Sequence, residues 1–123
     1  MRRWFAFGAF NGALAVTAGA FAAHGLKSRL TPDMLAVFDT GARYHLIHAL
    51  ALCLAAVVAA EWASRPARAA TVLFAAGIAL FSGSLYALAL TGTRAFGFVT
   101  PFGGVAFIAG WAALGWAGWK RKD

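Results

Sequence analysis

Three histidines are the side chains in this sequence best suited to bind a metal ion or a haem. His45 and His48 lie three positions apart, so on a helix both could reach one ion, with His24 from a neighbouring helix as a third ligand. Alternatively, His24 and His48 could be the two axial ligands of a haem. No metal-binding spacing such as His-Glu-x-x-His is present. We therefore expect no metal and no cofactor; if a metal is bound, His24 and His48 are its ligands.

Several residues with hydroxyl groups lie in the same apolar runs as the histidines or at their ends. On helices, Tyr44 would share a side with His48, and Ser82 with Tyr86, because each pair is four positions apart. Polar groups inside a bilayer are costly and often functional. One candidate ligand-binding cluster, near the outer face, therefore comprises His24, Tyr44, His48, Ser82, Ser84, Tyr86 and Thr100. The alternative, which we favour, is that these groups hydrogen-bond to one another and tie the helices together.

Acidic residues are too few and too badly placed for acid–base catalysis. Glu61 lies at the end of an apolar run, and Asp39 is the only acid close to the histidine pair. Ser82 and Ser84 consequently have no nucleophile–base–acid constellation. Export coupled to protons or cations needs a carboxylate inside the membrane, and none is present. We expect a protein that is not an enzyme.

The composition indicates that lipid surrounds the chain. Its 123 residues are 62% hydrophobic and 12% charged, against about half and about a quarter in soluble domains. Runs of about 20 apolar residues occur at 4–23, 44–60, 69–90 and 101–119. Each must be helical, because lipid cannot satisfy exposed backbone polar groups. We predict an all-α protein with one domain, 1–123, built as an integral membrane four-helix bundle.

The first apolar run could instead be a cleaved secretory signal, because a basic pair precedes it. However, it is longer than the about 7–15 residues of a signal core. It also carries Gly8, Gly12 and Gly19, which place small residues where another helix can pack closely. The amide of Asn11 needs a partner on a facing helix or in a second copy. We expect a retained span that packs through Gly8, Asn11, Gly12 and Gly19.

Residues 32–43 predict a short amphipathic helix on the outer side, between the first two spans. The sequence Thr-Pro-Asp at 31–33 supplies an N-cap, a proline for the first helical position and an acid for the first turn. Asp39 and Arg43 have the spacing of an ion pair on one helix face. This helix either lies on the membrane surface or runs into the second span. The Thr-Pro pair at 100–101 repeats this helix start, so we expect Thr100 to cap the fourth span in the same way.

The basic residues predict the orientation of the four spans. Both termini share one side with the loop between the second and third spans, and this side holds Arg2, Arg3, Arg65, Arg68, Lys120, Arg121 and Lys122. The other side holds Lys27, Arg29, Arg43 and Arg94, with two acids. The positive-inside rule places both termini in the cytoplasm, and four tryptophans mark the same boundary: Trp4, Trp62, Trp116 and Trp119. The net charge of +7 therefore suits lipid head groups rather than nucleic acid, for which no basic face exists.

Four stretches in order resemble the YgdD family. They are residues 19–26 (GAFAAHGL), 44–50 (YHLIHAL), 80–86 (LFSGSLY) and 100–104 (TPFGG), the last followed by a Gly-Trp pair. Members are small bacterial inner-membrane proteins of unknown function, with relatives in mitochondria. The resemblance implies four spans, an uncleaved first span and no known activity. It also implies motif positions at His24 and His48, whereas glutamine is commoner at position 45, which counts against His45 as a ligand.

These observations favour a small inner-membrane protein of unknown function that acts as a non-enzymatic scaffold or accessory subunit. Its partners would be the lipid bilayer and another membrane protein or a second copy. An alternative is a membrane binder of a metal, a haem or a small polar ligand at the histidine, serine and tyrosine cluster. A third is a small channel or carrier without carboxylate coupling.

Overall fold

The computed structural model of the chain describes residues 1–121, and all the regular structure in this range is helical. Helix α1 spans Arg2–His24 and α2 spans Pro32–Glu61. Helix α3 (Arg65–Gly77), a π-helical segment η1 (Ile78–Ser82) and α4 (Gly83–Thr91) form one continuous rod. A 3-10 segment, η2 (Arg94–Phe98), precedes α5 (Thr100–Trp119). The four rods are each long and apolar enough to cross a membrane, which confirms the predicted all-α, four-span architecture.

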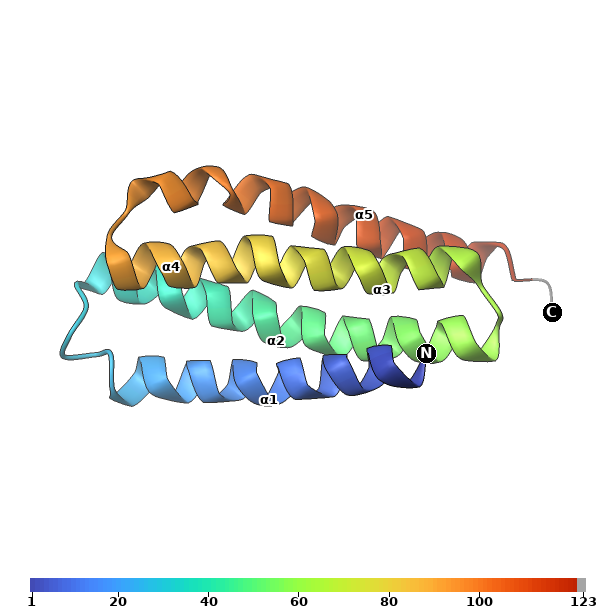
Figure 1. Cartoon of the computed structure of the whole chain (residues 1–123), viewed down its shortest axis with the longest axis horizontal. Helices are drawn as coiled ribbons and strands as arrows, with labels where there is room; N and C mark the ends of the chain where they lie inside the picture. The colour runs from blue at the N-terminus through green and yellow to red at the C-terminus, as the bar shows by residue number, and fades with distance from the viewer. Residues whose placement is uncertain (122–123) are drawn as a thin grey trace.

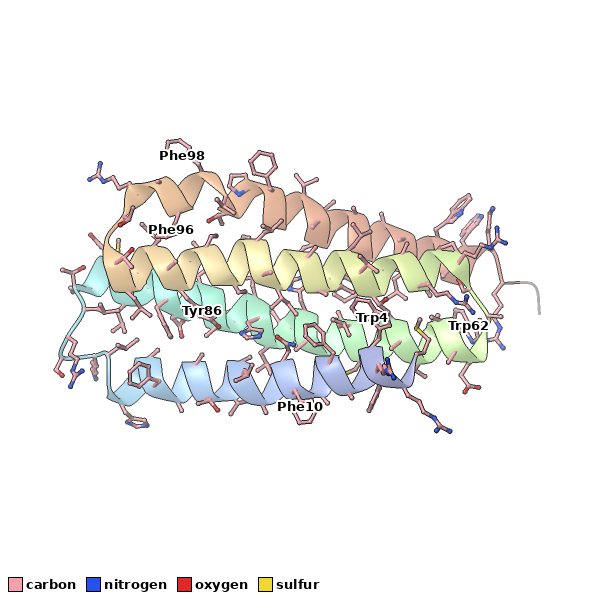
Figure 2. The ribbon with its side chains drawn as sticks, viewed as in Figure 1. Trp4, Phe10, Trp62, Tyr86, Phe96 and Phe98 are labelled. Atoms are coloured by element: carbon pink, nitrogen blue, oxygen red, sulfur yellow. The ribbon has the colours of Figure 1, made fainter. Side chains whose placement is uncertain are left out.

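The rods lie side by side in the order α1, α2, α3–α4, α5, with both termini at the same end (Figure 1). Helix α1 packs mainly on α2, whereas α5 packs on α3 and η1. Large apolar side chains such as Phe10 and Phe98 point away from the rods (Figure 2) and are 72% and 79% exposed. Such exposure is the arrangement expected when hydrocarbon, rather than water, covers the outer surface.

Residues 32–43 form the first turns of α2 rather than a helix of their own, which is the second of the two arrangements expected from the sequence. Gly41 does not interrupt this helix. It is buried, and a Cβ atom at its position would lie 3.1 Å from Cε1 of Tyr86. The absence of a side chain at Gly41 therefore lets the ring of Tyr86 pack closely against α2.

The two Thr-Pro sequences do not start their helices in the same way. Thr31 caps α2, since its hydroxyl accepts a hydrogen bond of 3.3 Å from the backbone N–H of Met34. The expectation of the same cap at Thr100 is wrong. Residue 99 is the N-cap of α5 and makes no side-chain cap bond, because Thr100 is already helical.

The backbones of α5 and η1 approach each other very closely at Gly103. A Cβ atom on Gly103 would overlap the backbone nitrogen of Phe81 and lie 2.7 Å from the carbonyl carbon of Leu80. Only a residue without a side chain allows two backbones to approach so closely. The neighbouring Gly104 is different, because its Cβ would meet only a ring carbon of Phe81, at 3.9 Å.

Replacing Gly103 with alanine is therefore expected to destabilise the protein by at least about 1–3 kcal/mol, the usual cost of overpacking. Gly104→Ala is the matched control on the same helix, and we expect it to be neutral or stabilising, because alanine favours helices by up to about 1 kcal/mol over glycine. Thermal unfolding in mild detergent measures both effects. Equal midpoints for the two variants would contradict the close approach of α5 to η1.

Candidate functional site

A chain of hydrogen bonds links α1, α2 and α4 through His45. Asn11 donates through Nδ2 to the carbonyl oxygen of Phe7 at 2.9 Å, so its Oδ1 faces His45 Nε2 at 3.0 Å. Since Oδ1 only accepts, Nε2 carries the proton. Nδ1 is then the acceptor, and the hydroxyl of Tyr86 donates to it at 2.9 Å. Every hydrogen bond in this network is therefore formed between neutral groups.

His48 makes a second set of hydrogen bonds, between α2 and α5. Its Nδ1–H donates to the carbonyl oxygen of Tyr44 at 2.7 Å. Nε2 is therefore the acceptor, and Trp111 donates to it through Nε1–H at 3.1 Å. The ring of Phe107 stacks on the imidazole with centroids 3.5 Å apart and planes within 10°. Both ring nitrogens of His48 are thus engaged, and one face of the imidazole is covered.

A pair of hydroxyl groups joins α4 to α5. Ser84 donates to the carbonyl oxygen of Phe81 at 2.9 Å, so Thr100 must donate to Ser84 Oγ, at 2.6 Å. The hydroxyl of Thr100 therefore joins two rods instead of capping its own helix, which explains why the capping expectation failed.

Ser82 stands apart from these networks. It is the last residue of η1, has no exposed surface, and its hydroxyl has no hydrogen-bond partner among residues 1–121. It was expected to share a helix side with Tyr86, but no hydrogen bond joins the two. An unpaired buried hydroxyl costs about 1–3 kcal/mol.

The structure separates His24 from the rest of the candidate cluster. His24 ends α1 and is exposed. Its neighbours Ala22 and Leu26 pack against Phe38, which is ten residues, or about 15 Å, along α2 from His48. The expected matching depth of His24 and His48 is therefore not observed, and the two do not form a pair of ligands.

His45 and its partners lie deeper than the position expected for the cluster, although Thr100 does begin α5 as expected. Asn11 is the tenth of the 23 residues of α1, so its partner His45 lies close to the middle of that span rather than near the outer face. The depth estimate failed because α2 begins at Pro32, which places twelve helical residues before Tyr44.

His45 and Trp111 are the two central residues that the candidate cluster lacked. The buried residues of α2 include Gly41, Ala42, His45, His48, Ala49 and Leu52, which follow the i, i+3, i+4 spacing of one helix face. That spacing already indicated that His45 faces the interior. The amide of Asn11, which needs a partner inside the membrane, pointed to the same conclusion.

Of the four residues expected to pack α1 against another helix, two contact α2 and two do not. Gly8 lies against α2, and a Cβ atom there would be 2.7 Å from Sγ of Cys53. Asn11 reaches His45, as described above. Gly12 and Gly19 have open space where a Cβ would be.

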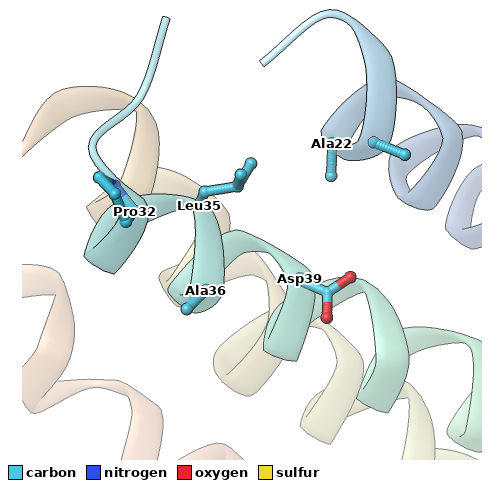
Figure 3. A pocket seen from close by; sticks show the side chains of 6 residues that line it. Ala22, Pro32, Leu35, Ala36 and Asp39 are labelled. Carbon is cyan, nitrogen blue, oxygen red and sulfur yellow. The ribbon is translucent and has the colours of Figure 1, made fainter. Parts of the chain in front are cut away.

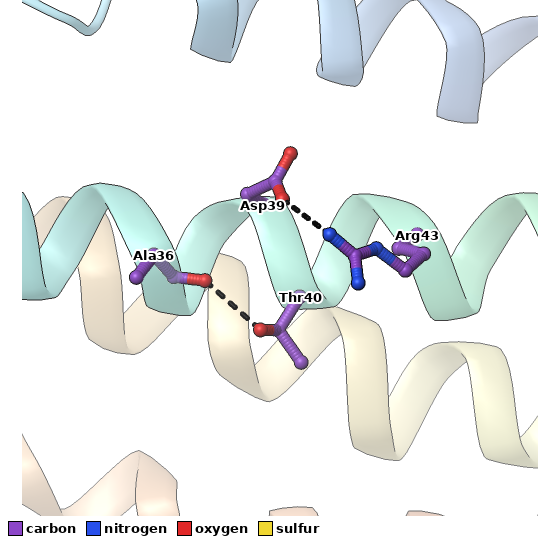
Figure 4. A network of polar contacts seen from close by, with 4 residues as sticks. All are labelled: Ala36, Asp39, Thr40 and Arg43. Atoms are coloured by element: carbon purple, nitrogen blue, oxygen red, sulfur yellow. Dashed lines mark hydrogen bonds and ion pairs between the residues drawn. The ribbon is translucent and has the colours of Figure 1, made fainter.

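One hollow adjoins the His48 network, and a second lies at the end of the bundle near His24. A groove of about 460 Å³ between α2 and α5 is lined in part by Tyr44, His48, Phe107 and Trp111. A pocket of about 360 Å³ lies between the end of α1 and the start of α2 (Figure 3) and includes Asp39. Asp39 is paired with Arg43 at 3.2 Å (Figure 4). The second pocket therefore has no uncompensated carboxylate to bind a cation.

A metal or haem iron requires a free nitrogen lone pair, and neither buried histidine offers one. The lone pair of His45 accepts from Tyr86, and that of His48 accepts from Trp111. Within residues 1–121, no three side chains of His, Cys, Asp or Glu come together closely enough to hold a metal ion. The geometry is that of a hydrogen-bonded core.

Comparison with known proteins matches residues 18–104 to a family described as "Protein of unknown function (DUF423)". The chain is 45% identical to the UPF0382 membrane protein YwdK of Bacillus subtilis over 115 residues, which is 93% of this chain and 94% of the relative. It is 42% identical to the UPF0382 inner membrane protein YgdD of Escherichia coli over 108 residues, 88% of this chain and 82% of the relative.

The chain belongs to the DUF423 family. It is a membrane protein, as these relatives are named, and the resemblance to YgdD seen in the sequence is confirmed. No solved structure matches the chain. The segment matched to the family model contains both buried histidines, Ser84 and Thr100, but not Asn11 or Trp111, which hold those histidines from α1 and α5.

Removing one hydroxyl tests the network around His45. Tyr86→Phe leaves the acceptor nitrogen of His45 unpaired, so we expect a loss of about 0.6–1.7 kcal/mol, from the average to the largest value measured for hydrogen bonds between membrane helices. Tyr44→Phe is the matched control, because the Tyr44 hydroxyl bonds to no residue in the described part of the chain. Reversible unfolding in detergent compares the two, and equal losses would contradict the network.

Proposed function

We propose that the chain is a non-enzymatic scaffold or accessory protein of the bacterial inner membrane, with both termini in the cytoplasm. The observation that carries this proposal is the internal pairing of its buried imidazoles. Every ring nitrogen of His45 and His48 is bonded to another residue of the same chain. These bonds therefore hold helices together, and they occupy both ring nitrogens of each imidazole, so that no lone pair is left over for a ligand.

The placement of the acids supports the same proposal. The four acids of the sequence are Asp33, Asp39, Glu61 and Asp123. Asp33 and Asp39 lie in the first turns of α2, and Glu61 ends that helix. A carboxylate in the middle of a span, which coupled transport or acid catalysis in the membrane would use, is absent from the sequence of all four spans.

A scaffold needs lateral surface, and α1 provides it. This helix packs mainly on α2, and the groove between them, about 460 Å³, is almost wholly apolar and includes Gly8, Gly12, Leu46 and Cys53. Small residues at such a surface allow another membrane helix to approach closely. The proposed partner is therefore a second membrane protein or a second copy of the chain.

A photoreactive residue at position 12 tests the scaffold role in native membranes. Because Gly12 has open space around it, the substitution should leave the fold intact, and we expect a covalent adduct with one defined membrane protein. Ile108, 72% exposed on α5, is the control position for random lipid-side encounters. The same diffuse adducts from both positions would argue against a specific partner.

The proposed orientation rests on charge and on the relative named as an inner membrane protein. The end with the termini carries six Arg and Lys residues within the described range, and positive charge favours the cytoplasmic side. In a Cys53→Ala background, we expect Ser28→Cys to react with an impermeant maleimide in intact cells. Trp119→Cys should react only after the membrane is opened. The reverse pattern would overturn the orientation.

A further inference from the structure

The end of the bundle that carries the termini is strongly basic. Six cations lie there in the described part of the chain: Arg2, Arg3, Arg65, Arg68, Lys120 and Arg121. Glu61 is the one acid among residues 1–121 at this end, and no ion pair involves it. The ion pair found in that range, Asp39–Arg43, belongs to the opposite end. The positive charge is therefore left for a partner outside these residues.

Two of these cations line a pocket. The turn between α2 and α3 faces the end of α5 across a hollow of about 220 Å³, bounded by Trp62, Ser64, Pro66, Ala117, Lys120 and Arg121. One wall is thus aromatic and apolar, and the other carries two positive charges. A ligand that fits both walls has an anionic group attached to an apolar body.

Indole rings hold both cations in place. The guanidinium carbon of Arg121 lies 4.4 Å from the ring centroid of Trp62, and the Lys120 ammonium lies 5.0 Å from that of Trp116. Cation–π contacts position a charge without neutralising it. Neither side chain donates a hydrogen bond within residues 1–121, so the N–H groups remain available to oxygen acceptors.

The level of the pocket in the membrane identifies the kind of anion. Tryptophans concentrate at the height of the lipid head groups, and Trp116 and Trp119 beside this pocket are 51% and 83% exposed. Basic pockets between spans at this height bind anionic head groups, and arginine suits phosphate because its N–H groups match two oxygens at once. We propose that this pocket binds the phosphate of an anionic phospholipid, with the acyl chains lying along the end of α5.

An anionic lipid fits better than a zwitterionic one or free phosphate. The ammonium group of phosphatidylcholine would be brought close to two cations of the same sign, which opposes binding. Inorganic phosphate would fill the charged wall but leave the indoles and Ala117 without a partner. The proposal therefore commits to a lipid with net negative charge, such as phosphatidylglycerol.

Native mass spectrometry of the full-length protein in detergent tests the proposal, with phosphatidylglycerol as the probe. Lys120→Gln with Arg121→Gln should weaken binding by at least about fivefold, since each basic residue near an anionic surface contributes about that factor. Lys27→Gln with Arg29→Gln removes the same charge from exposed residues at the opposite end. This control should change binding by less than about twofold.

Three results would overturn the proposal. The two double variants could weaken binding equally, which would mean an unspecific effect of net charge. Phosphatidylcholine could bind as tightly as phosphatidylglycerol, or inorganic phosphate could displace the lipid completely, which would identify a soluble anion as the occupant. All four substituted residues are exposed, so unchanged unfolding midpoints are expected and confirm that each variant is folded.

Discussion

Hydrocarbon offers no hydrogen bonds, and the interior of this protein is arranged around that constraint. Each buried imidazole has a donor on one side and an acceptor on the other; the bonds of His45 join three rods, and those of His48 join α2 to α5. The bonds also fix the tautomers, with the proton on Nε2 of His45 and on Nδ1 of His48. The helices must keep their relative depths and rotations, because a shift of one turn would leave several polar groups unpaired in lipid.

This requirement explains why α2 is the central element. It contributes both histidines, and three other helices supply their side-chain partners: α1 and α4 for His45, and α5 for His48. Helix α1 packs mainly on a single neighbour, α2, where Asn11 bonds to His45 and Gly8 lies close to Cys53. This edge of the row is also where Gly12 and Gly19 leave room for another helix.

The sequence was sufficient to predict the four spans, because hydrophobic length and the absence of water in the bilayer leave few alternatives. It was insufficient to predict which polar residues meet. The estimate of depth took Tyr44 as the start of the second span, whereas α2 begins at Pro32. The π-helical turn at η1 was also invisible, and a π turn changes the phase of every face carried across it. His45 was set aside on family resemblance, although its place on the buried face of α2 was visible in the spacing.

The buried hydroxyl of Ser82 is the one side-chain group in the described interior that a ligand could pair with, and it is inaccessible. Its hydroxyl is the one buried side-chain group without a partner in residues 1–121, and a free donor of this kind could in principle serve a ligand. However, it has no exposed surface, and it ends η1, whose backbone lies very close to α5 at Gly103. A ligand could reach it only if α5 separated from η1 and broke the bond between Ser84 and Thr100. Interaction is therefore less costly at the basic end and along α1 than in the core, which is where both proposals place it.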